Sequence, residues 1–225
     1  MKILLVEDEL ELLHSMKDYL SMEGFVCEIA PDYSTASRLI GAYEYDCIVI
    51  DITLPDRSGL LLIEEIKKIN TETGIIIVSA KNSIDDRVFG LSQGSDDYLT
   101  KPFHLSELNA RLKALIRRKY FKGSDVVHCA SLMIDISAKK LFVNKVEIIL
   151  TQKEYEMLVY LISGKEKVFT KEAIAEHLWG DSIDQADSFG FIYTHIKNLR
   201  RKITDAGGVD PIVTVYGLGY KIVCQ

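Results

Sequence analysis

The chain has 225 residues, of which 48% are hydrophobic, and carries a formal net charge of −6 at pH 7. This length allows one or two domains, each large enough to bury its own core. There is no apolar run of about 18 residues and no signal-peptide pattern at the start, so we expect a cytoplasmic protein without a membrane partner.

The four cysteines, Cys27, Cys47, Cys129 and Cys224, show no paired spacing. Disulfide frameworks and zinc sites both have recognisable spacings, and this chain has neither. We expect buried or incidental thiols and no disulfide.

Four apolar runs in the first half, residues 3–6, 47–50, 75–78 and 98–99, predict strands. Helical stretches separate them, which indicates a parallel sheet buried on both faces. Functional groups of such sheets gather beyond the carboxyl ends of the strands. The residues that follow or close these runs should therefore meet in one crevice; they are Glu7, Asp8, Asp51, Ser79 and Lys101.

These side chains suit phosphoryl chemistry. Three carboxylates in one crevice repel one another, and a Mg²⁺ ion with oxygen ligands relieves that repulsion. Asp51 can form an acyl phosphate, Lys101 can neutralise phosphoryl oxygens, and Ser79 can donate a hydrogen bond to one of them. A single acid after a strand is usually a turn residue and a single lysine is usually solvated, so the joint pattern carries the hypothesis.

Four motifs occur in a specific order in the first half: ILLVED at 3–8, DITLP at 51–55 with Gly59, SAK at 79–81, and GSDDYLTKPF at 94–103. In these motifs residues 1–119 resemble the receiver domain of bacterial two-component response regulators. The resemblance implies a flavodoxin-like (βα)5 fold with a five-stranded parallel sheet, phosphorylated on Asp51 by a sensor histidine kinase. It implies Mg²⁺ bound by Asp8, Asp51 and the Thr53 carbonyl, with Glu7 acting mostly through water. It also implies phosphate sensing by Ser79, Tyr98 and Lys101.

Charge is distributed unevenly along the chain. Residues 1–119 carry 14 basic and 20 acidic residues, whereas residues 120–225 carry 13 of each. Residues 120–125 are too few, and too poor in Pro and Ser, for a long flexible tether. We therefore expect a domain at 1–119, a short linker at 120–125 and a second domain at 126–225.

The second half contains a basic segment without acids from Ser188 to Thr204. Its apolar residues recur at helical spacing and predict a helix from about Asp187 to Ile203 with one buried stripe: Ile192, Ile196, Leu199 and Ile203. The opposite face carries Thr194, Lys197, Asn198 and Arg201, with Tyr193 and Arg200 at its flanks. A helix with an apolar back and a basic, amide-bearing front can enter a major groove.

Sequence patterns on both sides of this helix predict further helices and a hairpin. Thr151 and Glu154 form a capping-box pattern before one helix, and Thr170 and Gly180 bound a second. After the basic helix, the alternating segments 212–215 and 220–223 around 216–219 indicate a hairpin.

The most specific motifs of this half are HIKNLRRKI at 195–203 and VYGLGY at 215–220. With 150–155 and 169–180 they resemble the winged helix-turn-helix domain of OmpR/PhoB-type regulators, in which a four-stranded antiparallel sheet comes first; residues 126–149 fit that sheet. Asn198 and Tyr216 stand where many members have arginine. The first changes the expected base preference, and the second argues against an arginine contact from the wing to the minor groove.

The resemblance and the helix pattern together predict promoter-DNA contacts. Asn198 can pair with adenine, and Lys197 or Arg201 can reach guanine or phosphate. The full predicted set is Tyr193, Thr194, His195, Lys197, Asn198, Arg200, Arg201, Thr214 and Tyr216. For Arg200 an internal salt bridge is an equally supported alternative.

Charged residues late in the first domain would alone be ordinary exposed charges of little energetic value. In the family that this domain resembles, the face formed by the fourth helix, the fifth strand and the fifth helix of the receiver forms a homodimer on phosphorylation. On that model Arg87 meets Glu107 of the partner chain and Asp97 meets Arg111, with Asp96 nearby.

We therefore expect a phosphorylation-switched, DNA-binding transcription regulator that works with RNA polymerase and is not an enzyme. One alternative is a phosphohydrolase of the haloacid-dehalogenase type, but Thr53 stands where that chemistry commonly needs a second acid. The other is a DNA-binding regulator that acts without receiver phosphorylation; the intact pocket argues against it.

Overall fold

The computed structural model describes residues 1–81, 83–164, 166–180 and 189–224. The chain divides into two compact units, residues 1–119 and 120–225, and each is described by itself. None of the described helices is both long enough and apolar enough to cross a membrane.

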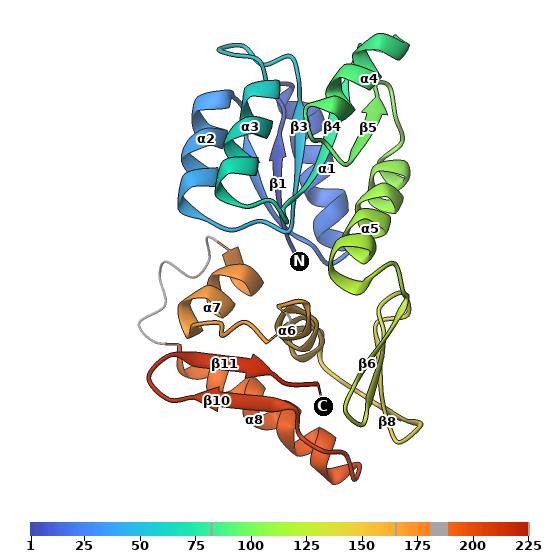
Figure 1. The fold of residues 1–225 in the computed structure, drawn as a ribbon, viewed down its shortest axis with the longest axis vertical. Coiled ribbons are helices and arrows are strands. Elements are labelled where there is room, and N and C mark those ends of the chain that lie inside the picture. Colours follow the sequence, from blue (N-terminus) through green and yellow to red (C-terminus); the bar gives the residue numbers. More distant parts are fainter. Residues whose placement is uncertain (82, 165, 181–188, 225) are drawn as a thin grey trace. The chain divides into compact units, whose positions relative to one another are not determined.

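The first unit alternates strands and helices (Figure 1). Its strands are β1 (Lys2–Val6), β2 (Val26–Ala30), β3 (Cys47–Asp51), β4 (Gly74–Ser79) and β5 (Asp97–Thr100). Its helices are α1 (Leu10–Met22), α2 (Tyr33–Ala42), α3 (Leu60–Ile69), α4 (Ile84–Ser92) and α5 (Leu105–Phe121). All neighbouring strands are parallel, in the order β2-β1-β3-β4-β5, which confirms the predicted flavodoxin-like α/β fold.

Helices cover both faces of this sheet, which explains the unbroken apolar runs. On one face, Leu4, Ile48 and Ile77 pack with buried residues of α2 and α3. On the other, Leu5 and Val49 pack with buried residues of α1 and α5. In the three central strands β1, β3 and β4, polar side chains therefore occur only at the strand ends, and the candidate site lies at the carboxyl ends.

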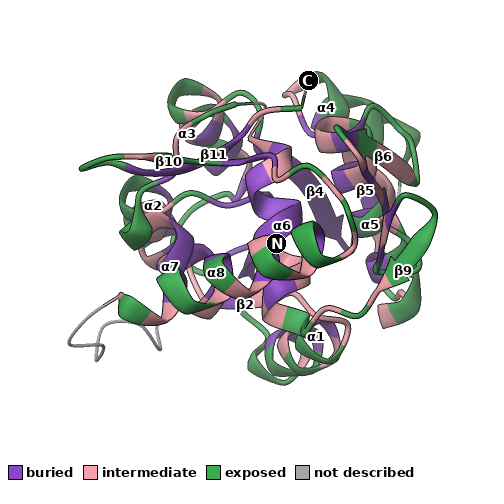
Figure 2. Ribbon diagram, turned by 90° about the horizontal axis from the view of Figure 1, so that it is seen from below, coloured by how far each residue is buried: buried purple, intermediate pink, exposed green. Residues whose placement is uncertain are grey.

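The second unit begins with an antiparallel sheet in the order β6-β7-β8-β9. Its strands are β6 (Val126–Cys129), β7 (Leu132–Asp135), β8 (Lys140–Val143) and β9 (Val146–Ile148). Then come α6 (Gln152–Ser163), α7 (Lys171–Trp179), α8 (Gly190–Asp205) and a hairpin of β10 (Ile212–Val215) and β11 (Gly219–Ile222). Figure 2 shows α6 as a largely buried helix of this unit.

Several local predictions for this unit are confirmed. Thr151 and Glu154 form the capping box of α6, and the Thr170 side chain caps α7 by accepting from the Ala173 N–H. Gly180 ends α7 at a positive φ of 56°. The stripe of α8 is fully buried, but the predicted start of this helix at Asp187 lies outside the described residues.

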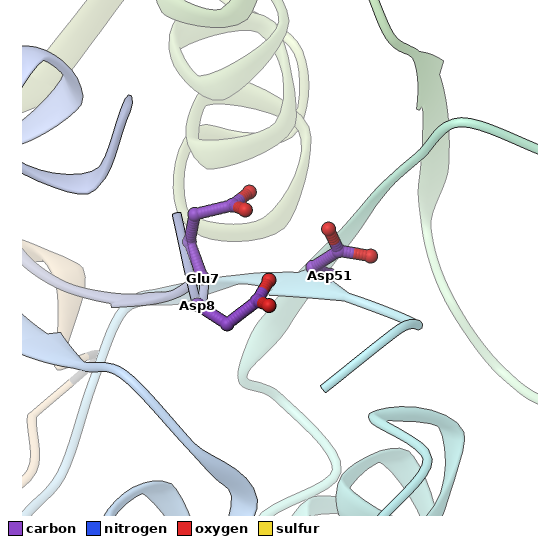
Figure 3. A group of neighbouring side chains, drawn as sticks. All are labelled: Glu7, Asp8 and Asp51. Atoms are coloured by element: carbon purple, nitrogen blue, oxygen red, sulfur yellow. The ribbon is translucent and has the colours of Figure 1, made fainter. Parts of the chain in front are cut away.

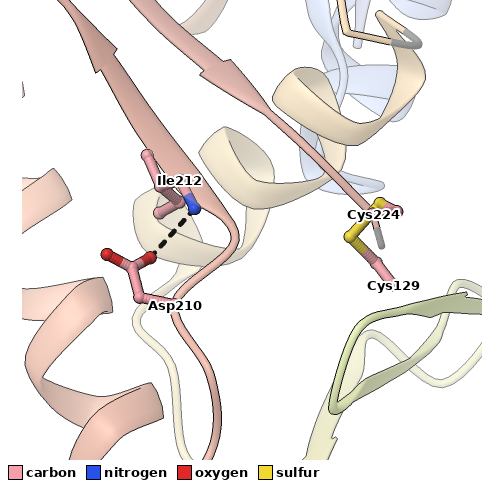
Figure 4. Close-up of a disulfide and its surroundings, with 4 residues drawn as sticks. All are labelled: Cys129, Asp210, Ile212 and Cys224. Carbon is pink, nitrogen blue, oxygen red and sulfur yellow. Dashed lines mark hydrogen bonds between the residues drawn. A yellow bond between two sulfur atoms is a disulfide. The ribbon is translucent and has the colours of Figure 1, made fainter.

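The expectation of four unpaired thiols is wrong. Cys129 and Cys224 form a disulfide (Figure 4). Cys27 and Cys47 are free and buried. The two bonded cysteines are separated by 95 positions, at the end of β6 and just after β11. Spacing rules could not reveal this pair, because only the folded chain brings those two strand ends together.

Candidate functional site

Three carboxylates meet at the carboxyl ends of β1 and β3. Glu7 and Asp8 follow β1 directly and Asp51 is the last residue of β3 (Figure 3). One ligand oxygen of each lies within 4.8 Å of the others. Glu7 and Asp51 are buried, whereas Asp8 is exposed. An all-oxygen donor set with one solvent-facing member fits a hard divalent cation such as Mg²⁺, which keeps several waters.

Lys101 lies between two of these carboxylates. Its Nζ is 2.6 Å from an oxygen of Glu7 and 2.6 Å from Oδ2 of Asp51. Burial raises the pKa of Glu7, and the nearby Asp51 charge adds to the rise, while hydrogen bonding to Lys101 opposes it. Burial alone would lower the pKa of Lys101, but hydrogen bonds to Asp51 and Glu7 outweigh it and raise that pKa. The lysine therefore stays charged and compensates both carboxylates.

The loop after β3 holds Asp51 in place. The Thr53 N–H donates to Oδ1 of Asp51 at 2.8 Å, which turns the loop back over the carboxylate. Gly59 packs against the Asp51 backbone so closely that a Cβ there would lie 2.0 Å from the Asp51 carbonyl oxygen. The predicted glycine is thus required for this close approach.

Two hydroxyl groups, one on β4 and one on β5, contact the loop that follows β4. Ser79 is fully buried at the end of β4, and its Oγ accepts from the Lys81 N–H at 3.2 Å. The Tyr98 hydroxyl donates to the Lys81 carbonyl at 2.8 Å. Two of the three predicted sensing residues, Ser79 and Tyr98, thus contact one segment, the loop between β4 and α4. A phosphoryl group that attracts the Ser79 hydroxyl would compete with that loop contact.

Sequence reasoning did not find Asp56, which follows Pro55 in the loop after β3. Its carboxylate accepts from the N–H groups of Tyr33 and Ser34 and from the Ser34 hydroxyl, at the start of α2. Burial opposes the charged form, but these hydrogen bonds outweigh it and lower the pKa of Asp56 to about 2. No local signal reveals this contact, because the partners are more than twenty positions apart.

The front of α8 carries the predicted DNA-contacting residues. Tyr193, Thr194, Lys197 and Arg201 are exposed and Asn198 is half-buried. In the part of the chain that the structure describes, Lys197 and Arg201 have no ion-pair partner. At the tip of the β10–β11 hairpin Tyr216 is 94% exposed, and Thr214 also faces solvent.

Two cations of the basic segment are instead bound within the domain. Arg200 pairs with Asp210 at 3.0 Å and donates to the Ile212 carbonyl and the Thr214 hydroxyl of β10. Lys202 pairs with Glu154 of the capping box at 2.6 Å. The structure thus gives Arg200 the internal salt bridge that the sequence left open.

His195 lies against an aromatic cluster at the start of α8. Its ring centroid is 5.7 Å from that of Trp179, which also meets Phe191 edge-on at 4.8 Å. This packing explains why His195 is only half-exposed. The contact anchors the end of α7 to the first turns of α8.

The predicted dimer residues mostly make contacts within the chain. Arg111 binds Asp97 at 3.0 Å and Glu107 at 2.8 Å, and Asp96 pairs with Lys119 at 3.2 Å. Arg87 is exposed on α4. The same helix exposes four apolar side chains to solvent, namely Ile84, Val88, Phe89 and Leu91.

Comparison with known proteins agrees with this geometry. Residues 3–113 match the response regulator receiver domain, and residues 145–222 match the C-terminal domain of transcriptional regulatory proteins. The chain is 38% identical to the two-component response regulator PhoP of Pseudomonas aeruginosa, over 98% of this chain and 97% of that protein. It is 35% identical to the transcriptional regulatory protein QseB of Haemophilus influenzae, over 99% and 98%.

A solved CheY-like receiver domain from Methanospirillum hungatei matches at a TM-score of 0.52 with 30% identity, covering 54% of this chain and 98% of that one. The two domain matches fall on separate units of the fold, one with the acidic pocket and one with the basic helix. The chain belongs to the two-component response regulators of the OmpR/PhoB type, which join a receiver domain to a winged-helix DNA-binding domain.

Proposed function

We propose that Asp51 accepts a phosphoryl group from a sensor histidine kinase and that this event controls DNA binding by α8. The observation that carries the proposal is the position of Lys101, which lies 2.6 Å from the Asp51 carboxylate in a pocket with two further acids. In the reaction the phosphorus–nitrogen bond of the kinase phosphohistidine breaks, and a phosphorus–oxygen bond to Asp51 forms.

The residues around Asp51 have different roles: the acids would bind Mg²⁺, whereas Lys101 and Ser79 would contact the phosphoryl group. Mg²⁺ would be held by Asp8, Asp51 and the Thr53 carbonyl, with Glu7 acting through water, and it supplies positive charge for the phosphoryl oxygens. Lys101 neutralises charge on the same group, and the Ser79 hydroxyl donates a hydrogen bond to it. Lys101 then has a further acceptor beside the two carboxylates that it binds in this structure.

Phosphorylation would reach the rest of the receiver through the loop between β4 and α4. When Ser79 turns to the phosphoryl group, its contact with the Lys81 N–H is lost. Tyr98 holds the carbonyl of the same residue, so serine and tyrosine are linked through Lys81. This arrangement supports their role as a switch pair next to α4.

Labelling with acetyl phosphate tests the proposal. We expect the wild type to take up one phosphoryl group in the presence of Mg²⁺ and none after chelation, as seen by phosphate-affinity electrophoresis. Asp51→Asn should abolish labelling, while Asp85→Asn, at an exposed acid of α4, should leave it unchanged. Undiminished labelling of Asp51→Asn would contradict the proposal and favour regulation without receiver phosphorylation.

We further propose that the phosphorylated protein is a homodimer that binds promoter DNA and acts on RNA polymerase in the cytoplasm. The exposed apolar side chains of α4, next to Arg87, support a pairing surface there, because such patches mark interaction sites. The exposed front of α8 supports binding in the major groove.

A further inference from the structure

The disulfide of the second unit takes no part in phosphorylation or in the contacts of α8. Cys129 ends β6 and is 1% exposed, whereas Cys224 lies two residues beyond β11 and is exposed (Figure 4). The bond therefore joins the end of the DNA-binding hairpin to the four-stranded sheet. The sequence separation of 95 positions spans α6, α7 and α8.

The other two cysteines cannot form a competing bond. Cys27 and Cys47 both lie opposite Ile3, on the two strands that flank β1. They are therefore two strand spacings apart, about 10 Å, and a disulfide requires Cα atoms within about 7 Å. Burial raises the pKa of Cys27 to about 11 and also raises that of Cys47, which keeps both thiols protonated and unreactive at neutral pH.

We propose that Cys129 and Cys224 form a reversible thiol–disulfide site, through which a hydroperoxide stabilises the DNA-binding domain. The inference rests on the proposed DNA-binding function, because a protein at the chromosome works where cellular reductants keep thiols reduced. Oxidation removes one hydrogen from each thiol and forms the sulfur–sulfur bond. The hydroperoxide accepts both electrons and both protons, so hydrogen peroxide yields two waters.

Backbone hydrogen bonds hold the hairpin in place independently of the disulfide. Phe169 and Tyr220 exchange two backbone hydrogen bonds of 2.8 and 2.9 Å, which hold β11 against the segment that precedes α7. The Val223 N–H donates to the Pro211 carbonyl at 3.0 Å, directly before Cys224. Oxidation therefore acts mainly by restricting the unfolded chain, whose closed loop is long, and leaves the face of α8 as it is.

Calorimetry of the full-length protein, reduced with dithiothreitol and then treated or not with hydrogen peroxide, tests this inference. We expect peroxide to remove two hydrogen atoms from the intact mass and peptide mapping to recover a Cys129–Cys224 peptide. The melting transition of the DNA-binding domain should rise by roughly 10–20 °C, while that of the receiver should not move. Dithiothreitol should reverse both changes.

Cys224→Ser, at an exposed position, should abolish the rise, whereas the control Cys27→Ala should keep it. A mapped bond that involves Cys27 or Cys47, an unmoved transition, or a rise that persists in Cys224→Ser would overturn the inference. Titration of promoter DNA with both redox forms separates the two proposals: DNA binding persists if only the redox site fails, and it is absent from both forms if the DNA-binding function fails.

Discussion

Lys101 supplies a positive charge between the carboxylates of Glu7 and Asp51, which are too deeply buried to be screened by water. Glu7 is 1% exposed and Asp51 is 5% exposed, and both contact the same ammonium group. A buried charge that loses its partner costs several kcal/mol. The pocket therefore depends on this lysine for its stability as well as for its chemistry.

Replacement of Lys101 should make receiver stability depend on Mg²⁺. We expect Lys101→Met to lower the free energy of unfolding by about 3 kcal/mol in a chelator, and added Mg²⁺ to restore more of it than it adds to the wild type. Denaturant titrations with and without Mg²⁺ measure both effects. Lys113→Met is the matched control, since Lys113 and Glu23 form an exposed pair; an equal response of the two variants would refute this role.

Asp56 should stabilise the receiver in a pH-dependent manner. Its pKa of about 2 lies below the ordinary 3.8, so its contribution is fully present above the ordinary value and is lost as pH falls through the folded value. We expect Asp56→Asn to melt below the wild type at neutral pH. The two curves should converge between about pH 4 and about pH 2. A constant difference down to the lowest pH would show that charge on Asp56 is not the cause.

At the level of residues, the sequence predicted the part of the site whose residues stand at the carboxyl ends of the strands. Glu7, Asp51 and Lys101 meet because parallel strands bring their carboxyl ends to one edge of the sheet. Pairs such as Asp56 with Ser34 do not follow from any strand, helix or turn rule. Each depends on how two loops pack, which a local pattern does not encode.

Helix α8 divides its polar residues between two tasks. Lys197, Asn198 and Arg201 lie on the front, while Arg200 fastens the helix to Asp210 and β10. The apolar period predicted the buried stripe, but not that Arg200 turns toward the hairpin. The flank of a helix meets whatever segment the fold places there, and periodicity alone does not identify that segment.

Substitutions along α8 should separate base reading from phosphate binding and from support. Asn198→Ala should cost roughly 1–3 kcal/mol of binding and relax preference at one base position. Lys197→Ala, if that lysine contacts phosphate, should weaken all sequences alike and reduce the log–log salt slope by about 0.9. Titrations on a selected operator and its point variants, at several salt concentrations, measure both.

Arg200→Ala is the comparison variant for a residue that holds α8 in place. It should lower the melting temperature of the DNA-binding domain as well as the affinity of that domain for DNA. Asn198→Ala should leave that melting temperature unchanged. If Asn198→Ala binds every operator variant as the wild type does, α8 does not read bases through this residue.

At the scale of the whole molecule, pairing of receivers requires a change of partners. Arg111 now binds Asp97 and Glu107 of its own chain, so these groups must be released or shared in a dimer that uses them. Exposed pairs of this kind contribute little energy, so the exchange would cost little in the proposed dimer, and the apolar residues of α4 would supply the larger gain.

Charge reversal tests this surface. Arg87→Glu should weaken the dimer of the phosphorylated or beryllofluoride-treated protein, and Glu107→Arg added to it should partly restore the dimer. Sedimentation velocity measures both, with Lys113→Glu as a control on another part of the receiver. A dimer of unchanged strength in Arg87→Glu would exclude these contacts.

Helix α5 continues through Phe121 and β6 starts at Val126, so only residues 122–125 link the two elements. Four residues span at most about 14 Å when fully extended. In the proposed dimer, this short linker keeps each DNA-binding domain close to its receiver. Once one domain has bound its half-site on the DNA, the second therefore binds at an effective concentration in the millimolar range. A longer linker would lower the effective concentration of the second domain without changing any contact to DNA.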